Sequence, residues 1–154
     1  MTVPSIEPSV PLVSICSQIL NQCDWAKEMI QSVVDSTYQN WELLIVDDGS
    51  TEDLKSVIES FKDERIQYFR FEENKGIPFG QNSLLPKAKG KYVCLLAADE
   101  VITKEKTAEQ VAYLESHPQV DCVWGLPGSG SDAPKGGWPM GLRPEYEQYT
   151  LRAH

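Results

Sequence analysis

The chain has 154 residues, with 14 basic and 23 acidic side chains and a formal net charge of −9. This length suits one domain with a buried core, and the dispersed acidic charge argues against unassisted binding to nucleic acid or to an anionic membrane face. No apolar run approaches the ~20 residues of a membrane-spanning helix, and residues 1–10 have neither the basic start nor the apolar stretch of a signal peptide. We therefore expect a cytoplasmic protein with a disordered lead-in over residues 1–10.

From residue 11 onward, short apolar runs alternate with segments whose apolar residues recur at helical spacing. The runs predict five strands, at residues 11–16, 42–46, 66–71, 92–96 and 120–124. Such a rhythm is typical of an α/β fold with a mostly parallel sheet and helices on both faces.

The first two helices have recognisable start signals. Asp24 is a candidate N-cap for a helix that runs to residue 36. Ser50 and Asp53 resemble a capping box, after which apolar residues follow at i, i+3, i+4 and i+7 as far as Phe61.

The next two helices are predicted from proline and threonine. Pro78 suits the first turn of a helix, whereas Pro86 removes a backbone donor and predicts a kink or an early stop. Thr103 is a candidate cap for a helix over residues 104–116.

The composition changes after Trp124. Residues 125–141 contain six glycines and three prolines, which is typical of a long loop. We therefore divide the chain into a lead-in at 1–10, a folded domain at 11–124, and a Gly/Pro-rich loop and tail at 125–154.

Cysteine and histidine usage excludes several kinds of site. None of the four cysteines has C-x-x-C spacing, and Cys16, Cys94 and Cys122 lie in apolar strand-like runs, where free cysteine behaves as a small hydrophobe. Two histidines are too few for a histidine-based metal site and argue against a Ser-His-Asp triad.

Acidic pairs follow two of the predicted strands. Asp47 and Asp48 end the second strand, ahead of a Gly-Ser turn, and Asp99 and Glu100 follow the fourth. Ligands of open α/β sheets bind beyond the carboxyl ends of the strands. These acids predict a rim that binds hydrogen-bond donors, a divalent cation, or both.

Seven motifs occur in a fixed order. They are Pro-Leu-Val-Ser-Ile at 11–15, Ser-Val-Val-x-Ser-Thr-Tyr-Gln-Asn-Trp-Glu at 32–42, Val-Asp-Asp-Gly-Ser-Thr at 46–51, Asn-Lys-Gly at 74–76, Asn82, Ala-Lys-Gly-Lys-Tyr at 88–92 and Leu-Leu-Ala-Ala-Asp-Glu at 95–100. In this order and spacing, residues 11–124 resemble the nucleotide-sugar-binding half of a family 2 glycosyltransferase with the Rossmann-like GT-A fold.

The resemblance implies a role for each matching residue. Asp48, with Asp47 beside it, would accept a hydrogen bond from the nucleotide base, and Asp99 would bind Mn2+ or Mg2+ at the diphosphate, with Glu100 as a second ligand. The other positions implied to bind the nucleotide sugar are Gln18, Leu20, Asn21, Gly76, Gln81, Asn82, Ala97 and Ala98. The implied reaction is an inverting transfer of the sugar to a saccharide, lipid or protein acceptor.

The sequence departs from the family pattern in three respects. Ala97 replaces the first Asp of the metal motif D-x-D, which should weaken cation binding. Gln18 and Gln81 stand where the family often has Pro and Arg. No general base is found, because Asp132, Glu145 and Glu147 lack a convincing setting, so the tail predicts the start of a missing acceptor region.

Other functions stay open at this stage. A non-catalytic relative could use the same fold to bind a nucleotide or a protein. A phospho-receiver module is disfavoured because its acidic pair would follow the first strand, and a dinucleotide-binding dehydrogenase because no G-x-G-x-x-G follows that strand. Self-association is possible for a truncated domain.

Overall fold

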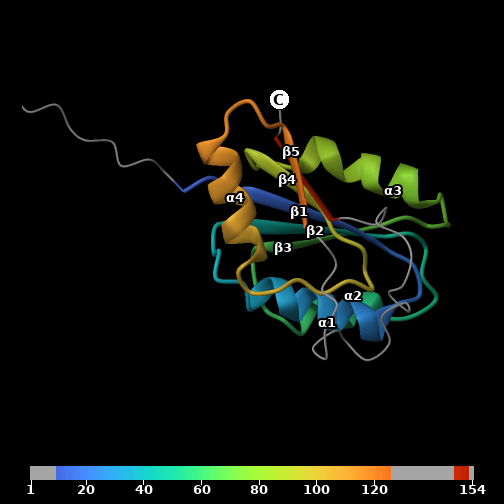
Figure 1. Cartoon of the computed structure of the whole chain (residues 1–154). Coiled ribbons are helices and arrows are strands. Elements are labelled where there is room, and N and C mark those ends of the chain that lie inside the picture. Colours follow the sequence, from blue (N-terminus) through green and yellow to red (C-terminus); the bar gives the residue numbers. More distant parts are fainter. Residues whose placement is uncertain (1–9, 126–147, 153–154) are drawn as a thin grey trace, which may run out of the picture.

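The computed structural model describes residues 10–125 and 148–152 (Figure 1). Six strands form one sheet in the order β3-β2-β1-β4-β6-β5. The strands are β1 Val13–Ile19, β2 Trp41–Asp47, β3 Ile66–Arg70, β4 Tyr92–Leu95, β5 Cys122–Gly125 and β6 Gln148–Arg152. The helices are α1 Cys23–Val34, α2 Leu54–Glu59, α3 Ile77–Leu84 with a 3-10 turn at Leu85–Lys87, and α4 Lys106–Ser116.

The predicted parallel sheet is confirmed for four strands. β1 pairs in parallel with β2 and β4, and β2 with β3. β6 lies antiparallel between β4 and β5. It was not predicted, because residues 148–152 fall in the segment expected to be loop and tail, and their pairing partners lie far away in sequence. The division into domains stays a prediction, since most of the lead-in and tail lies outside the described residues.

Helices cover both faces of the sheet, as the alternation predicted. In β2, Leu43 and Ile45 belong to the core beneath α1, α2 and α4, whereas Leu44 and Val46 pack with Leu84 of α3. Figure 1 shows α1 and α2 on one side of the strands and α3 on the other. A strand buried on both faces reads as a continuous apolar run, which is why β2 was predicted within one residue at each end.

Two helix starts differ from the sequence prediction. Asp24 is not the N-cap of α1, which begins at Cys23, whose backbone N–H donates to the Glu52 carboxylate at 2.9 Å. Ser50 does not cap α2. Asp53 does, accepting from the Ser56 N–H at 3.1 Å, because the Ser50 hydroxyl already accepts from the Asn21 N–H and the Ser50 N–H donates to Asp47. α2 also ends at Glu59, before Phe61.

The later helices follow their predicted breakers more closely than their predicted caps. Pro78 lies in the first turn of α3, and the helix stops at Leu84, ahead of Pro86, as expected. α4 begins at Lys106 rather than residue 104, because the Lys104 carbonyl accepts from the Thr37 N–H at 2.9 Å and holds this segment outside the helix. Within the described part of the chain, no helix has the length and apolarity needed to cross a membrane.

The thiols of Cys16 and Cys23 are poorly nucleophilic. Burial, together with the nearby Cys94 and Glu42, raises the pKa of Cys16 to about 12. Burial and a hydrogen bond to Glu52 raise the pKa of Cys23 to about 11. Both therefore remain protonated near neutral pH, where the thiolate would be the reactive form.

A buried polar network joins the amino-terminal ends of the strands. One oxygen of the Glu42 carboxylate accepts from the Ser14 hydroxyl at 2.6 Å and from the Lys89 N–H at 2.7 Å. The Ser14 hydroxyl oxygen accepts from the Gly90 N–H at 2.8 Å, and a Cβ at Gly90 would lie 2.6 Å from the Ser14 backbone nitrogen. Glu42 thus fixes the turn that leads into β4, at the opposite edge from the acidic pairs.

We expect Glu42→Gln to destabilise the fold without affecting any ligand at the other edge. Glutamine keeps the shape but offers one acceptor oxygen, whereas the second oxygen of Glu42 also accepts, from Nε2 of Gln67 at 3.2 Å, so we predict a loss of about 1–2 kcal/mol in the free energy of unfolding. Denaturant unfolding measures it. An exposed control, Glu59→Gln, should leave stability nearly unchanged. Equal effects of the two substitutions would contradict the role of the network.

Candidate active site

The two acidic pairs lie at the same edge of the sheet, as predicted. β2 ends at Asp47 and β4 at Leu95, with β1 between them. The Leu96 N–H donates to the Cys16 carbonyl and the Asp48 N–H to the Ile19 carbonyl. Both segments that leave the sheet are therefore attached to β1, whose end forms the middle of the site.

Asp48 holds the loop that leads into α3. Its Oδ1 accepts from the Lys75 N–H at 2.7 Å, and its Oδ2 accepts from the Gly76 N–H at 3.0 Å. Oδ2 also accepts from Nε2 of the Gln18 side chain at 2.9 Å. A carboxylate has about four acceptor sites. Three are in use here, and only one of the donors, Gln18, is a side chain that can move away.

Asp47 is turned into the protein. Its Oδ1 accepts from the Ser50 N–H at 2.7 Å, and its Oδ2 accepts from the Tyr68 hydroxyl at 2.7 Å and from Arg70. Burial alone would raise the pKa of Asp47, but the bonds from Ser50 and Tyr68 and the Arg70 cation hold that pKa below its ordinary value. Asp47 is therefore an ionised, fully buried brace of the turn.

Close backbone approach fixes the position of this loop. Gly49 has φ +80°, and a Cβ there would lie 2.8 Å from the carbonyl carbon of Glu73. Gly76 has φ +85° and is the N-cap of α3. A Cβ at Gly80 would lie 2.5 Å from Cγ of Gln18, so α3 packs against the same side chain that donates to Asp48.

Asn21 connects the loop after β1 to the turn after β2. It adopts a positive φ of 51°, which Asn tolerates better than most residues. Its N–H donates to the Ser50 hydroxyl at 3.0 Å, and its side-chain oxygen accepts from the Thr51 N–H at 2.8 Å. The predicted base-packing loop is thus rigidly joined to the acidic turn.

The acidic pair after β4 has a different geometry. A carboxylate oxygen of Glu100 accepts from the Ala97 N–H at 3.0 Å and closes a tight turn. Asp99 lies at the tip of this turn and is exposed, whereas Ala98 is buried. Across residues 10–125 and 148–152, no three His, Cys, Asp or Glu side chains gather as a metal site. A cation here would need oxygens from its substrate.

The structure brings together some of the predicted site residues. Gln18, Asp48 and Gly76 form one bonded cluster, to which Asn21 and Asp47 are joined through the turn. Leu20 is half-buried just after β1, and Gln81 and Asn82 lie on α3, half-buried and exposed respectively. Among the described contacts, none links this cluster directly to Asp99 or Glu100.

Sequence reasoning missed Tyr68 and Arg70. In the parallel register, Arg70 lies beside Asp47 and Tyr68 beside Ile45. Residues two apart on a strand point to the same face, so a polar Tyr68 and Arg70 on the strand next to two acids were a usable signal. The signal could be applied only once the pairing of β2 with β3 was known.

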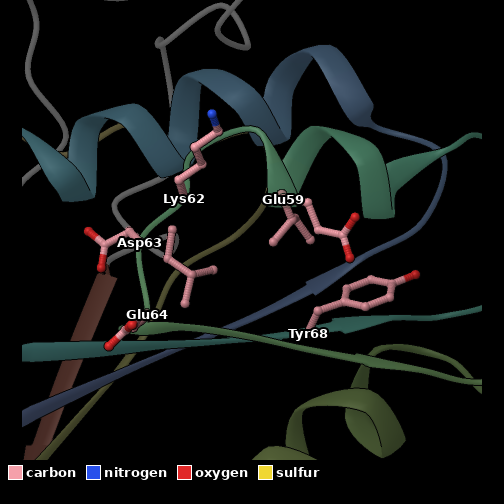
Figure 2. A pocket seen from close by; sticks show the side chains of 7 residues that line it. Glu59, Lys62, Asp63, Glu64 and Tyr68 are labelled. Carbon is pink, nitrogen blue, oxygen red and sulfur yellow. The ribbon is translucent and has the colours of Figure 1, made fainter.

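A shallow groove of about 440 Å³ lies apart from the predicted site residues, between the end of α2 and β3 (Figure 2). Figure 2 shows Glu59 and Tyr68 at one end and Asp63 and Glu64 at the other. Its charges are of both signs, and Asp63 is paired with Arg65 at 2.6 Å. Its connection to the site is through Tyr68, whose hydroxyl bonds Asp47.

Comparison with known proteins gives a family match over most of the chain. The model of Glycosyl transferase family 2 matches residues 14–152. A putative teichuronic acid biosynthesis glycosyltransferase, TuaG of Bacillus subtilis, is 34% identical over 106 residues, which are 68% of this chain and 42% of that protein. The Escherichia coli UDP-Glc:alpha-D-GlcNAc-diphosphoundecaprenol beta-1,3-glucosyltransferase WfaP is 33% identical over 105 residues, with the same coverage.

Solved structures share the fold. Staphylococcus aureus TarS 1–349 in complex with UDP-GlcNAc superposes with a TM-score of 0.71 at 22% identity, covering 77% of this chain and 35% of that chain. The Pyrobaculum calidifontis mannosyltransferase PcManGT, in complex with GDP-Man and Mn2+, gives a TM-score of 0.67 at 21% identity, covering 73% and 34%. The chain thus spans less than half the length of these relatives.

Proposed function

This chain belongs to glycosyl transferase family 2, and from that premise we propose that it is the donor-binding part of an inverting enzyme that uses a UDP-sugar. The observation that carries the proposal is the Asp48 cluster at the carboxyl end of β2, where a buried carboxylate is joined to Gln18 and to the loop before α3. UDP is favoured because WfaP is a glucosyltransferase that uses UDP-Glc and TarS has been solved in complex with UDP-GlcNAc.

Asp48 would recognise the base by exchanging one donor for another. An imide N–H of uracil could replace the Gln18 amide on Oδ2, while the Lys75 and Gly76 N–H groups stay in place. Because both oxygens already face fixed donors, the carboxylate needs little rearrangement to accept the base. Leu20 and Asn21 would then pack against the base, and Gly76, Gln81, Asn82, Ala97 and Ala98 would line the rest of the pocket.

The residues after β4 fit a cation that shares its ligands with the substrate. Mg2+ sites commonly use one or two carboxylates plus substrate phosphates. Asp99 is exposed and would be the main protein ligand, with Glu100 second once it releases the Ala97 N–H. When bound, the cation would neutralise charge on the departing nucleoside diphosphate.

Titration calorimetry with UDP, GDP and dTDP, each with and without Mn2+, tests the proposal on this chain. We expect UDP to bind most tightly and Mn2+ to strengthen it. Absence of binding for all three nucleotides, in this chain and in a form extended by an acceptor region, would overturn the proposal. Preference for GDP or dTDP would overturn the assignment of UDP alone.

A second candidate function is a binding module without turnover. Ala97 and Gln81 favour it, since the site lacks a carboxylate and a cation that the family pattern often supplies. If the chain is part of a catalytic enzyme, the acceptor of the sugar would be a saccharide, a lipid or a protein. Self-association of the chain is a separate proposal. We also propose a cytoplasmic location, where the four free cysteines would stay reduced. Sugar transfer by an extended form would exclude the non-catalytic candidate.

We expect Ala97→Asp to strengthen cation binding in the presence of UDP. Ala97 is exposed beside Asp99 and Glu100, so a carboxylate there adds a hard oxygen ligand, and we predict roughly tenfold tighter Mn2+ binding. Calorimetry of Mn2+ into the UDP complex measures this. Ala97→Asn is the matched control and should give a much smaller gain. Equal Mn2+ affinity in wild type and Ala97→Asp would show that the cation lies elsewhere.

A further inference from the structure

The charge of this chain is unevenly distributed. Residues 74–98, which contain α3, the 3-10 turn and β4, carry four lysines and no acidic residue, whereas ten basic and all 23 acidic residues lie elsewhere. Acidic pairs bound this segment on both sides, Glu72-Glu73 before it and Asp99-Glu100 after it, and Lys91 is paired with Glu115 at 2.6 Å, so the lysines that matter beside α3 are Lys75 and Lys87. Local rather than net charge decides contact with a charged surface, because screening limits the range of a charge to ~8 Å at physiological salt.

The same segment exposes apolar side chains. Of the described residues, the large hydrophobic ones most exposed to solvent are Val10, Ile77, Phe79, Leu85 and Tyr113. Three of these belong to α3 and its 3-10 turn, with 60% of Ile77, 52% of Phe79 and 43% of Leu85 exposed. Phe79 and Leu85, together with the exposed Pro78 and Pro86, form what we call the α3 face, whereas Ile77, two residues before Phe79, points to another side of the helix.

The α3 face contains no charged side chain, although the solvent side of a surface helix is usually charged. Contiguous apolar patches on a protein surface mark contact sites when they are large. The opposite side of α3, Leu84, is buried in the core, so the helix is held firmly with this face outward. In Figure 1, α3 lies on one side of the sheet and α1 and α2 lie on the other.

Lysines flank the α3 face at both ends. The Lys75 ammonium lies 5.2 Å from the ring centroids of Phe71 and Phe79, and the Lys87 ammonium lies 4.7 Å from the ring centroid of Phe69. Both lysines are exposed. Within the described part of the chain, no carboxylate forms a salt bridge with either. Their charge is available to an anionic partner.

We propose that the α3 face docks this protein on an anionic lipid surface. Phe79 and Leu85 enter the headgroup region, and Lys75 and Lys87 contact lipid phosphates. Aromatic and aliphatic anchors beside lysines are the arrangement that binds peripherally at such interfaces.

This docking does not require the proposed function, but it would give that function a location. Gly76, at the start of α3, is bonded to Asp48, so the lipid surface would adjoin the candidate site. A lipid-borne acceptor would then reach the donor by diffusion in the membrane plane, an implication that rests on the proposed function.

Vesicle flotation of this chain tests the docking. We expect binding to vesicles of phosphatidylglycerol and phosphatidylcholine in equal parts, little binding to phosphatidylcholine alone, and release by salt. The double substitution Phe79→Ser with Leu85→Ser, and separately Lys87→Glu, should each lower the bound fraction roughly tenfold. The matched controls Tyr113→Ser and Lys55→Glu, which lie on α4 and α2, should bind as the wild type does.

Several outcomes would overturn the docking. They are no binding by the wild type, equal binding by the α3 variants, equal loss in the controls, or a change in oligomeric state of the double variant, which would assign the face to a second copy. UDP titration of the same variants separates the two proposals. Loss of lipid binding with unchanged UDP affinity supports docking, and normal lipid binding without UDP binding overturns only the proposed function.

Discussion

Replacing Asp48 with asparagine is expected to weaken UDP binding by on the order of a hundredfold, the equivalent of one lost hydrogen bond to a charged acceptor. The carboxylate accepts from two backbone N–H groups and from Gln18. An amide has one acceptor oxygen, and its NH2 group would face either the Lys75 or the Gly76 N–H. We also expect the free energy of unfolding to fall by about 2–3 kcal/mol, because a buried donor is left unpaired.

The measurement is calorimetry at a temperature at which the variant is folded, with unfolding followed by circular dichroism. Asp53→Asn is the matched control. Asp53 also accepts from a backbone N–H, as the cap of α2, but it is exposed. The control should lose less stability and keep its UDP affinity. A folded Asp48→Asn variant that binds UDP as tightly as the wild type would remove Asp48 from the base site.

Much of the fold could be predicted because local patterns and burial agree. The continuous apolar run of β2 and the prolines around α3 specify their elements without help from distant residues. β6 could not be predicted, since its place between β4 and β5 depends on pairings with residues far away in sequence. The predicted cap of α1 was wrong for a similar reason, because the Cys23 N–H in the first turn of α1 donates to Glu52, which belongs to another loop.

The candidate site was predicted at the level of the sheet edge but not at the level of individual contacts. Asp47 and Asp48 look equivalent in sequence, yet they point to different partners. Asp47 is bonded inward to Tyr68 and Arg70 of β3, and Asp48 to the loop before α3. The alternation of side chains along a strand separates neighbouring residues in this way. Which of the two acids bonds to β3 depends on the parallel register between β2 and β3, and this register cannot be predicted from the sequence alone.

The division of labour between the two acids has a physical rationale. A carboxylate that must accept a ligand needs one donor that can leave, which Gln18 supplies to Asp48. A carboxylate that shapes the turn needs donors that cannot leave, which the Ser50 N–H and Tyr68 supply to Asp47. The turn that positions Asp48 is therefore held by Asp47, so substitutions at the two positions should differ in kind.

Asp47→Asn is accordingly expected to act on stability first, with a loss of about 3 kcal/mol at pH 7, because it removes one member of a bonded charge pair and turns an NH2 group toward Arg70 or Ser50. Tyr68→Phe, which removes one of the bonds, should lose about 1 kcal/mol. UDP affinity of the folded variant should fall less than in Asp48→Asn. A larger loss of affinity at Asp47 than at Asp48 would reverse the roles assigned to them.

The cost of Asp47→Asn should depend on pH. The pKa of Asp47 is lower in the folded protein than its ordinary value of 3.8, so its ionised form stabilises the fold at any pH above that value. The contribution is lost as the pH falls below about 4 and toward the folded pKa, where the native carboxylate takes up a proton. Urea unfolding of wild type and variant from pH 7 down to pH 3 should show the two stabilities converging. A difference that stays constant over this range would mean that the charge of Asp47 does not stabilise the turn.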